Sequence, residues 1–196
     1  MNQNLSPLPE IRSYQKFRKV SQPDNQQYFV DNLFSLTIMQ KQTRTKIIMD
    51  VHTRHINTKA FPIIAELLQE HLPSVFTTTC YNDLGLPFYE EVKNTEIGHL
   101  FEHILLEYLC QYKLAKGAKR ATYIGRTTWN WLRDPFGRFY IHLTCGKKDK
   151  DILPLALEQT VGLTKILLDY HRQPLFATTV PLAAQNGLQN GERGWR

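Results

Sequence analysis

The stretch at residues 95–113 constrains the fold more than any other, because it predicts a helix that is apolar on nearly all sides. At about 100° per residue, Leu, Ile, Phe and Tyr side chains fill most of the circle around its axis. A helix of this composition is mostly buried, and its few polar side chains then need partners. Thr95 has a side chain that favours the N-cap position, so we expect the helix to begin there.

The rest of the chain alternates irregularly between predicted strands and predicted helices. Runs rich in β-branched and aromatic residues predict strands, and apolar residues at helical spacing predict helices. The predicted strands cover residues 28–39, 46–52, 75–80, 120–124 and 138–144. The other predicted helices cover 61–72, before Pro73, and about 154–170, with Asp151 as a candidate cap. This order predicts a single α+β domain, with helices packed on one face of a mostly antiparallel or mixed sheet.

Composition sets the boundaries of this domain and its expected surroundings. Residues 1–26 and 184–196 are polar and predict a flexible arm and tail around a domain at 27–183. Three cysteines are too few and too irregularly spaced for a disulfide framework, which suits a reducing compartment. The chain shows no signal peptide and no apolar run of membrane length, so we expect a cytoplasmic protein without membrane partners.

Two histidines share one side of the long helix, because His99 and His103 lie four residues, about one turn, apart. Their imidazoles can converge on one ion, and imidazole nitrogen is a good ligand for zinc. Glu102 can reach a water beside that ion without binding the metal. The sequence 99–103 reads H-x-x-E-H, the reversed form of the H-E-x-x-H metallopeptidase motif. We therefore predict a Zn²⁺ site with His99 and His103 as ligands and Glu102 as the catalytic base.

A catalytic zinc usually has a third protein ligand, and the sequence offers two candidates. Cys80 ends a predicted strand just before the helix, and a thiolate binds zinc strongly. Glu107 continues the histidine face but lies about 12 Å along the helix axis from His99. We predict Cys80 as the ligand, with Glu107 as the alternative or as the carboxylate that orients His103. The plainer alternative is a pair of ordinary histidines, a solvated glutamate and a buried thiol.

These residues lie in a longer segment, about 61–168, that resembles the N-terminal domain of cyanophycin synthetase. The similarity is carried by LLQEHLPSVFTTTC (67–80), TEIGHLFEHILLE (95–107), YIGRT (123–127) and the strand at 137–143. Its most specific piece is G-H-x-x-E-H-x-x-x-E (98–107), followed by Gly125-Arg126-Thr127. The resemblance implies a metal-dependent hydrolytic site that cuts cyanophycin into short primers, and a role in binding the polymer.

Cyanophycin is a poly-aspartate with arginine on each side chain, so the resemblance implies a peptide polymer as substrate and the synthetase as a candidate partner. Arg126 would then be a catalytic residue that stabilises an oxyanion or holds a substrate carboxylate. Thr128 replaces the family's second arginine after G-R-T, and Gly85-Leu86-Pro87 replaces its glycine-rich loop. These 196 residues are too few for the synthetase's two further domains and contain no G-x-x-x-x-G-K-[ST] loop, so we expect a stand-alone protein that does not polymerise.

Three functions remain at this point. The first is a zinc hydrolase of the metallopeptidase type that cleaves a cyanophycin-like backbone, and Glu102 favours it, because a structural zinc does not need that carboxylate. The second is a non-catalytic module that binds the polymer or the synthetase. The third is a nucleic-acid binder, which rests only on a net charge of +6 and a tryptophan-containing loop, and which we rank last.

Overall fold

A six-stranded antiparallel sheet and four α-helices make up the computed structural model, which describes residues 17–21, 26–82 and 85–169. The strands are β1 (Phe17–Ser21), β2 (Gln26–Val30), β3 (Phe34–Gln40), β4 (Thr45–Val51), β5 (Gly125–Thr128) and β6 (Arg138–Leu143). The helices are α1 (Ile64–His71), α2 (Phe88–Glu91), α3 (Ile97–Ala115) and α4 (Leu153–Asp169). Short 3-10 turns occupy Thr58–Ala60, Pro73–Thr77, Val92–Asn94 and Lys147–Asp149.

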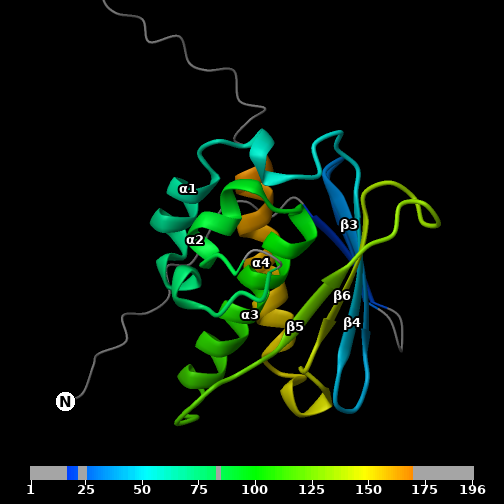
Figure 1. Ribbon diagram of the computed structural model, residues 1–196. Helices are drawn as coiled ribbons and strands as arrows, with labels where there is room; N and C mark the ends of the chain where they lie inside the picture. The colour runs from blue at the N-terminus through cyan, green and yellow to red at the C-terminus, as the bar shows by residue number, and fades with distance from the viewer. Residues whose placement is uncertain (1–16, 22–25, 83–84, 170–196) are drawn as a thin grey trace, which may run out of the picture.

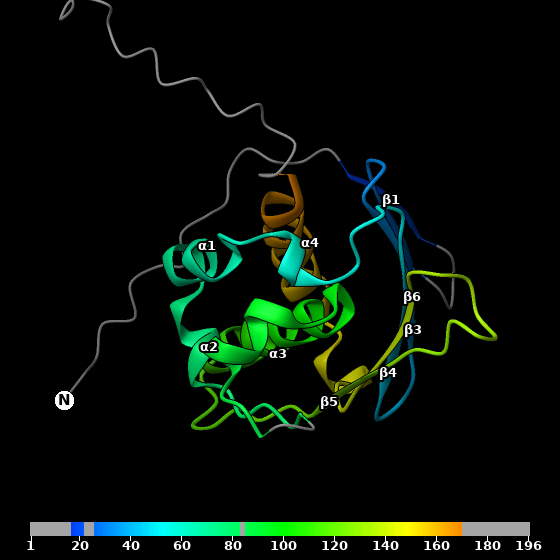
Figure 2. The same cartoon turned by 45° about the horizontal axis from the view of Figure 1, so that its top comes forward.

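The strands follow the order β1-β2-β3-β4-β6-β5, so that β5 forms one edge of the sheet. The helices lie together on one face of this sheet, with α3 and α4 beside it and α1 and α2 farther out (Figures 1 and 2). This arrangement confirms the predicted α+β domain. None of the described helices is both long enough and apolar enough to cross a bilayer.

The core lies between the sheet and α3 with α4. Burial alternates along β3 and β4, as expected for strands with one covered face. In α3, Leu100, Phe101 and Ile104 are fully buried, as its apolar surface predicts. A Cβ atom at Gly98 would lie only 2.4 Å from the ring of Phe139 on β6, so this glycine allows α3 to approach the sheet closely.

Several predicted elements differ from the structure. The stretch 28–39 is a hairpin, with a turn that closes through Leu33 N–H and Val30 C=O at 2.9 Å and with Asp31 at a φ of 44°. The strand predicted at 120–124 is wrong, because Ile124 N–H bonds the Thr144 side chain and regular pairing starts at Gly125. Helix α4 begins at Leu153, with Ile152 C=O accepting its first bond, so Asp151 is not the cap.

The strand predicted at 75–80 is also wrong, because this segment contains the turn Pro73–Thr77. Pro73 occupies the first position of that turn, where its fixed φ suits a helical conformation. The Thr77 and Thr78 hydroxyls donate to main-chain carbonyl groups three residues earlier and so stabilise the turn.

The boundaries of the predicted arm and tail are tested only in part. Strand β1 and the first residue of β2 fall inside the arm predicted at 1–26, so this segment contributes to the sheet. The remainder of that arm, the tail at 184–196 and the domain end at 183 lie outside the described residues.

Candidate metal centre

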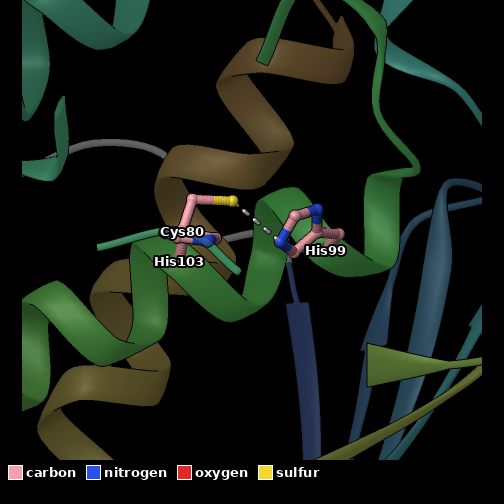
Figure 3. A group of neighbouring side chains, drawn as sticks. All are labelled: Cys80, His99 and His103. Atoms are coloured by element: carbon pink, nitrogen blue, oxygen red, sulfur yellow. Dashed lines mark hydrogen bonds between the residues drawn. The ribbon is translucent and has the colours of Figure 1, made fainter. Parts of the chain in front are cut away.

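Three side chains from two segments converge near the start of α3. His99 and His103 lie one turn apart on the helix, and Cys80 follows the turn Pro73–Thr77 (Figure 3). Their ligand atoms all lie within 4.8 Å of one another, and Cys80 Sγ is 3.6 Å from His99 Nε2. No other group of three or more such ligands occurs among the described residues. The structure thus brings together the ligands predicted from the sequence, with Cys80 as the third.

The separation of Cys80 Sγ and His99 Nε2 is compatible with a tetrahedral zinc ion. With Zn–S near 2.3 Å and Zn–N near 2.0–2.1 Å, tetrahedral angles place a sulfur and a nitrogen ligand about 3.6 Å apart. Cys80 Sγ and His99 Nε2 already have this separation. Three protein ligands leave one of the four positions free for water or substrate, as in catalytic zinc sites.

Hydrogen bonds orient both imidazole rings toward this centre. Thr78 Oγ1 donates to Val75 C=O at 2.6 Å, so it accepts from His103 Nδ1, which is 3.1 Å away. This places the proton of the neutral ring on Nδ1 and leaves Nε2 with a lone pair for a metal. His99 Nδ1 likewise lies 2.8 Å from Thr95 Oγ1.

Thr95 was predicted to cap the helix, and this prediction is wrong because its side chain contacts His99. The N-cap position belongs to Glu96, and the Thr95 side chain contacts His99 one turn along the helix. Thr95 is fully buried, because its main chain pairs with Thr58 through bonds of 2.7 and 2.8 Å. The residue that sequence reasoning assigned to the helix end therefore positions a candidate ligand.

Two further contacts hold the cluster in place. Phe88 of α2 stacks on His103, with ring centroids 3.8 Å apart and an interplanar angle of 13°. Asn82 donates through Nδ2 to Cys80 Sγ at 3.3 Å, and its Oδ1 accepts from Leu86 N–H at 2.9 Å. The loop that carries Cys80 is thus tied to the segment leading into α2.

Burial keeps the histidines neutral and therefore ready to bind a metal. It lowers the pKa of His99, and burial together with the charge of His99 lowers the pKa of His103 to about 3. Burial also raises the pKa of the Cys80 thiol, and the Glu91 and Glu102 carboxylates raise it further. A metal ion bound here would displace the thiol proton, since only thiolate is a good ligand.

Glu102 is buried beside this cluster and not solvated. Its side chain accepts a hydrogen bond of 2.5 Å from Thr127 Oγ1 on β5, and Glu102 as a whole is only 5% exposed. Burial raises the pKa of this carboxyl to about 7, although the Thr127 bond opposes the shift. A Cβ atom at Gly125 would lie 2.5 Å from Glu102 Oε1, so the glycine makes room for the carboxyl. Such a group can exchange a proton near neutral pH.

The structure does not bring Glu107 into the cluster. Its Oε1 accepts from Gln111 Nε2 at 2.9 Å, and the ring nitrogen of His103 that Glu107 was expected to orient contacts Thr78 instead. Glu107 therefore lies outside the group of candidate ligands, and Thr78 occupies the place beside His103 that was expected for Glu107.

Arg126 lies on the opposite face of the sheet from the cluster. Side chains alternate along β5, and Gly125 and Thr127 contact Glu102 on the helix side, so Arg126 faces outward. It pairs with His142 of β6, whose pKa is lowered by burial and by the charges of Lys46, Arg126 and Arg44. Arg126 is therefore exposed on the side of β5 away from Glu102 and the candidate metal.

Sequence reasoning missed the residues that support the ligands, above all Thr78, Asn82 and Phe88. A weak signal was present, because Thr78 and Asn82 each lie two residues from Cys80 and carry hydrogen-bonding side chains. Nothing in the sequence links Phe88 to His103, since that contact depends on the packing of α2 against α3.

Comparison with known families agrees with the similarity noted in the sequence. The chain matches the family described as the cyanophycin synthase-like N-terminal domain over residues 46–130. The matched range includes all three candidate ligands, Glu102 and the contacts with β5. No curated protein matches the chain.

Proposed function

We propose that this chain is a metal-dependent hydrolase that cleaves amide bonds in the backbone of a cyanophycin-like Asp/Arg polymer. The observation that carries the proposal is the convergence of Cys80, His99 and His103 beside the buried carboxyl of Glu102. Among the described residues three ligands converge without a fourth, which favours a catalytic over a structural metal, since structural zinc sites are normally closed by four protein ligands.

Zinc is the metal that this set of ligands favours. One thiolate and two imidazoles are softer than the oxygen ligands of magnesium or calcium, and zinc accepts them in tetrahedral geometry. When bound, zinc supplies an acidified water and polarises the carbonyl oxygen of a substrate.

The residues of the chain then have separate tasks. Thr78 and Thr95 hold the two imidazoles in the orientation and protonation state that binding requires. Glu102 takes a proton from the attacking water and returns it to the leaving nitrogen, for which a pKa near 7 is well suited. Thr127 keeps the Glu102 carboxyl in one orientation throughout.

The similarity to the cyanophycin synthase-like domain supports the choice of polymer. A backbone of aspartate residues is cut internally, and the products are shorter chains of the kind that serve as primers. The synthetase is the proposed partner, because it would extend such chains.

One observation favours the second candidate, a polymer-binding module without catalysis. Arg126, the only residue that the sequence suggested for oxyanion stabilisation, faces away from Glu102. In this case the metal would order the start of α3, and the domain would hold the polymer for the synthetase.

A Glu102→Gln variant separates the two candidates. The wild-type protein, loaded with zinc, is incubated with cyanophycin, and the chain length is followed over time. We expect the wild type to shorten the polymer and the variant to do so about 10² to 10⁴ times more slowly at equal zinc content. Glu107→Gln, on the same helix, is the matched control and should retain activity. Equal cleavage rates for the wild type and Glu102→Gln would exclude Glu102 as the catalytic base, and binding without cleavage by either would favour the module.

A further inference from the structure

Strand β5 is the edge of the sheet nearest to Glu102. It pairs only with β6 among the described strands, in the register Gly125↔Leu143, Arg126↔His142, Thr127↔Ile141. An edge strand presents unpaired N–H and C=O groups along its free side, and such a side can accept another strand.

The hydrogen-bond pattern identifies the β5 residues that face this free side. Thr144 N–H donates to Ile124 C=O at 2.9 Å, so in an antiparallel pair the main-chain groups of Arg126 and Thr128 also point to β6. The pairing of β6 with β4 on its other side supports this assignment. Val51 N–H donates to Gly137 C=O at 2.9 Å, so the main-chain groups of the odd-numbered residues of β6 point to β4. The even-numbered residues of β6 therefore point to β5. The main-chain groups of Gly125 and Thr127 consequently point to the free edge.

These same two residues contact Glu102. Thr127 donates to its carboxyl, and Gly125 lies so close to it that a Cβ atom would overlap with the carboxyl oxygen. No hydrogen bond from another described segment reaches the main chain of Gly125 or Thr127. A peptide paired with this edge would lie about 4.8 Å from β5 and would run past Glu102.

We propose that the free edge of β5 binds the substrate as an added β-strand, with Gly125 and Thr127 as its main-chain partners. The occupant is an extended peptide main chain, and the choice of cyanophycin as a probe rests on the proposed function. Main-chain pairing gives affinity without regard to sequence, whereas alternate side chains of the added strand face the two sides of the sheet. Those on the outer side lie next to Arg126, which can pair with their carboxylates.

Residue-resolved amide hydrogen exchange tests the proposal within one strand. The zinc-loaded Glu102→Gln protein is saturated with soluble cyanophycin oligomers, and in parallel with oligo-aspartate of equal length. The amides of Arg126 and Thr128, which bond β6, should exchange slowly with and without the probe. The amides of Gly125 and Thr127 should exchange quickly in the free protein and at least tenfold more slowly with the probe. Unchanged exchange at saturation, or no binding of either probe, overturns the proposal.

A pair of variants at Thr127 gives an independent measurement. Thr127→Val removes the hydroxyl but keeps the outward N–H, whereas Thr127→Pro removes both and leaves the β6 ladder intact, as proline permits on an edge strand. We expect Thr127→Pro to bind the probe about threefold to tenfold more weakly than Thr127→Val, the range of one hydrogen bond. Equal binding by the two folded variants contradicts the proposal.

These experiments distinguish a failure of substrate binding at the β5 edge from a failure of the proposed hydrolase activity. If the wild type cleaves no polymer but Gly125 and Thr127 become protected, the hydrolase fails and the edge site stands. If the wild type cleaves and these amides stay unprotected, the hydrolase stands and the edge site fails.

Discussion

Helix α3 carries a buried polar cluster near each of its ends, and the two clusters differ in how their charges are balanced. Near its N-terminal end, Glu102 and His103 are buried and His99 is partly buried, and each of the three has a threonine hydroxyl as a hydrogen-bond partner. Near its C-terminal end, the fully buried side chain of Asp149 accepts from Lys113 Nζ at 2.7 Å and from Tyr123 OH at 3.0 Å.

The pKa values express this difference. Burial would raise the pKa of Asp149, but the hydrogen bonds from Lys113 and Tyr123 outweigh it and hold the pKa below its ordinary value. At Glu102 burial prevails, and the pKa rises to about 7. The cluster at Asp149 is therefore balanced in charge by the chain itself, which is typical of a structural ion pair. No cationic side chain of the described residues balances Glu102, which is typical of a site that binds a cation.

The largest expected effect is on metal binding at the N-terminal cluster. The purified protein should contain about one zinc per chain, and His99→Ala, His103→Ala or Cys80→Ser should each abolish this stoichiometry. Metal content by mass spectrometry and zinc titration in competition with a chelator give the measurement. Glu107→Gln is the control. Residues that support a metal ligand typically change metal affinity by at least about tenfold when they are replaced, and Glu107→Gln should lower the zinc affinity by less than this. Full occupancy in either histidine variant would show that the convergence of these side chains has another purpose.

The second effect is on stability at the C-terminal cluster. Lys113→Met leaves the buried Asp149 carboxylate with the hydrogen bond from Tyr123 and the more distant charge of Lys148, and should lower the free energy of unfolding by about 2 to 3 kcal/mol. This range lies below that for fully buried pairs, because the Lys113 side chain is 34% exposed. Denaturant titration measures the loss, and zinc content should not change. Lys116→Met is the matched control, because its 4.0 Å contact with Asp151 is largely exposed and should contribute less than about 0.5 kcal/mol.

The third effect is on the pH dependence of the metal-free protein, in which Glu102 and His103 act in opposite directions. The folded pKa of Glu102, about 7, lies above its unfolded value of 4.5, so protonation stabilises the fold as pH falls from 7 to 5. The folded pKa of His103, about 3, lies below its unfolded value of 6.5, so the same fall in pH destabilises the fold. Each contribution amounts to about 2 kcal/mol over this interval, and the two nearly cancel.

Single substitutions should reveal the two opposing pH dependences of the unfolding free energy. Relative to wild type, Glu102→Gln should lose about 2 kcal/mol of unfolding free energy between pH 7 and pH 5, and His103→Gln should gain about the same. Asp149 contributes nothing here, because its pKa lies below 3.8 and it stays ionised throughout the interval. Urea titrations after chelation of metal provide the values. Parallel curves for wild type and both variants would mean that neither side chain is desolvated as the structure describes.

The sequence predicted which side chains converge at the candidate site better than it predicted their surroundings, and the reason lies in the distances along the chain. His99, Glu102 and His103 share one helix, so their geometry follows from its periodicity, and α3 indeed runs over Ile97–Ala115 where 95–113 was expected. Cys80 was chosen for its thiol, and the structure brings it next to the two histidines, although it follows the turn Pro73–Thr77 and does not end a strand. The partners Thr78 and Phe88 belong to other segments, so only tertiary packing brings them to His103.

Arg126 shows a different limit of sequence reasoning. The strand was expected at 120–124 and is found at Gly125–Thr128, and the face of a strand on which a residue lies depends on its register. The G-R-T motif placed Arg126 next to two residues that contact Glu102, but alternation turns its side chain to the outer face. The neighbours of Arg126 in the sequence contact Glu102, but the side chain of Arg126 lies on the other face of the sheet.

The smallest expected effect therefore belongs to Arg126. Because its side chain lies on the outer face, Arg126→Gln should leave zinc content, unfolding free energy and the rate at saturating polymer unchanged. An exposed charge beside the β5 edge can still attract carboxylates of a bound chain, so the variant should bind cyanophycin oligomers about twofold to fivefold more weakly, as exposed ion pairs contribute up to about 1 kcal/mol. The loss should vanish at high salt, where such contacts are screened. Arg44→Gln, on the same face but in the β3–β4 loop, is the matched control and should bind as wild type does. A loss of 10²-fold or more in the saturated rate would place Arg126 at the reacting bond, and the β5 orientation described here could not accommodate that result.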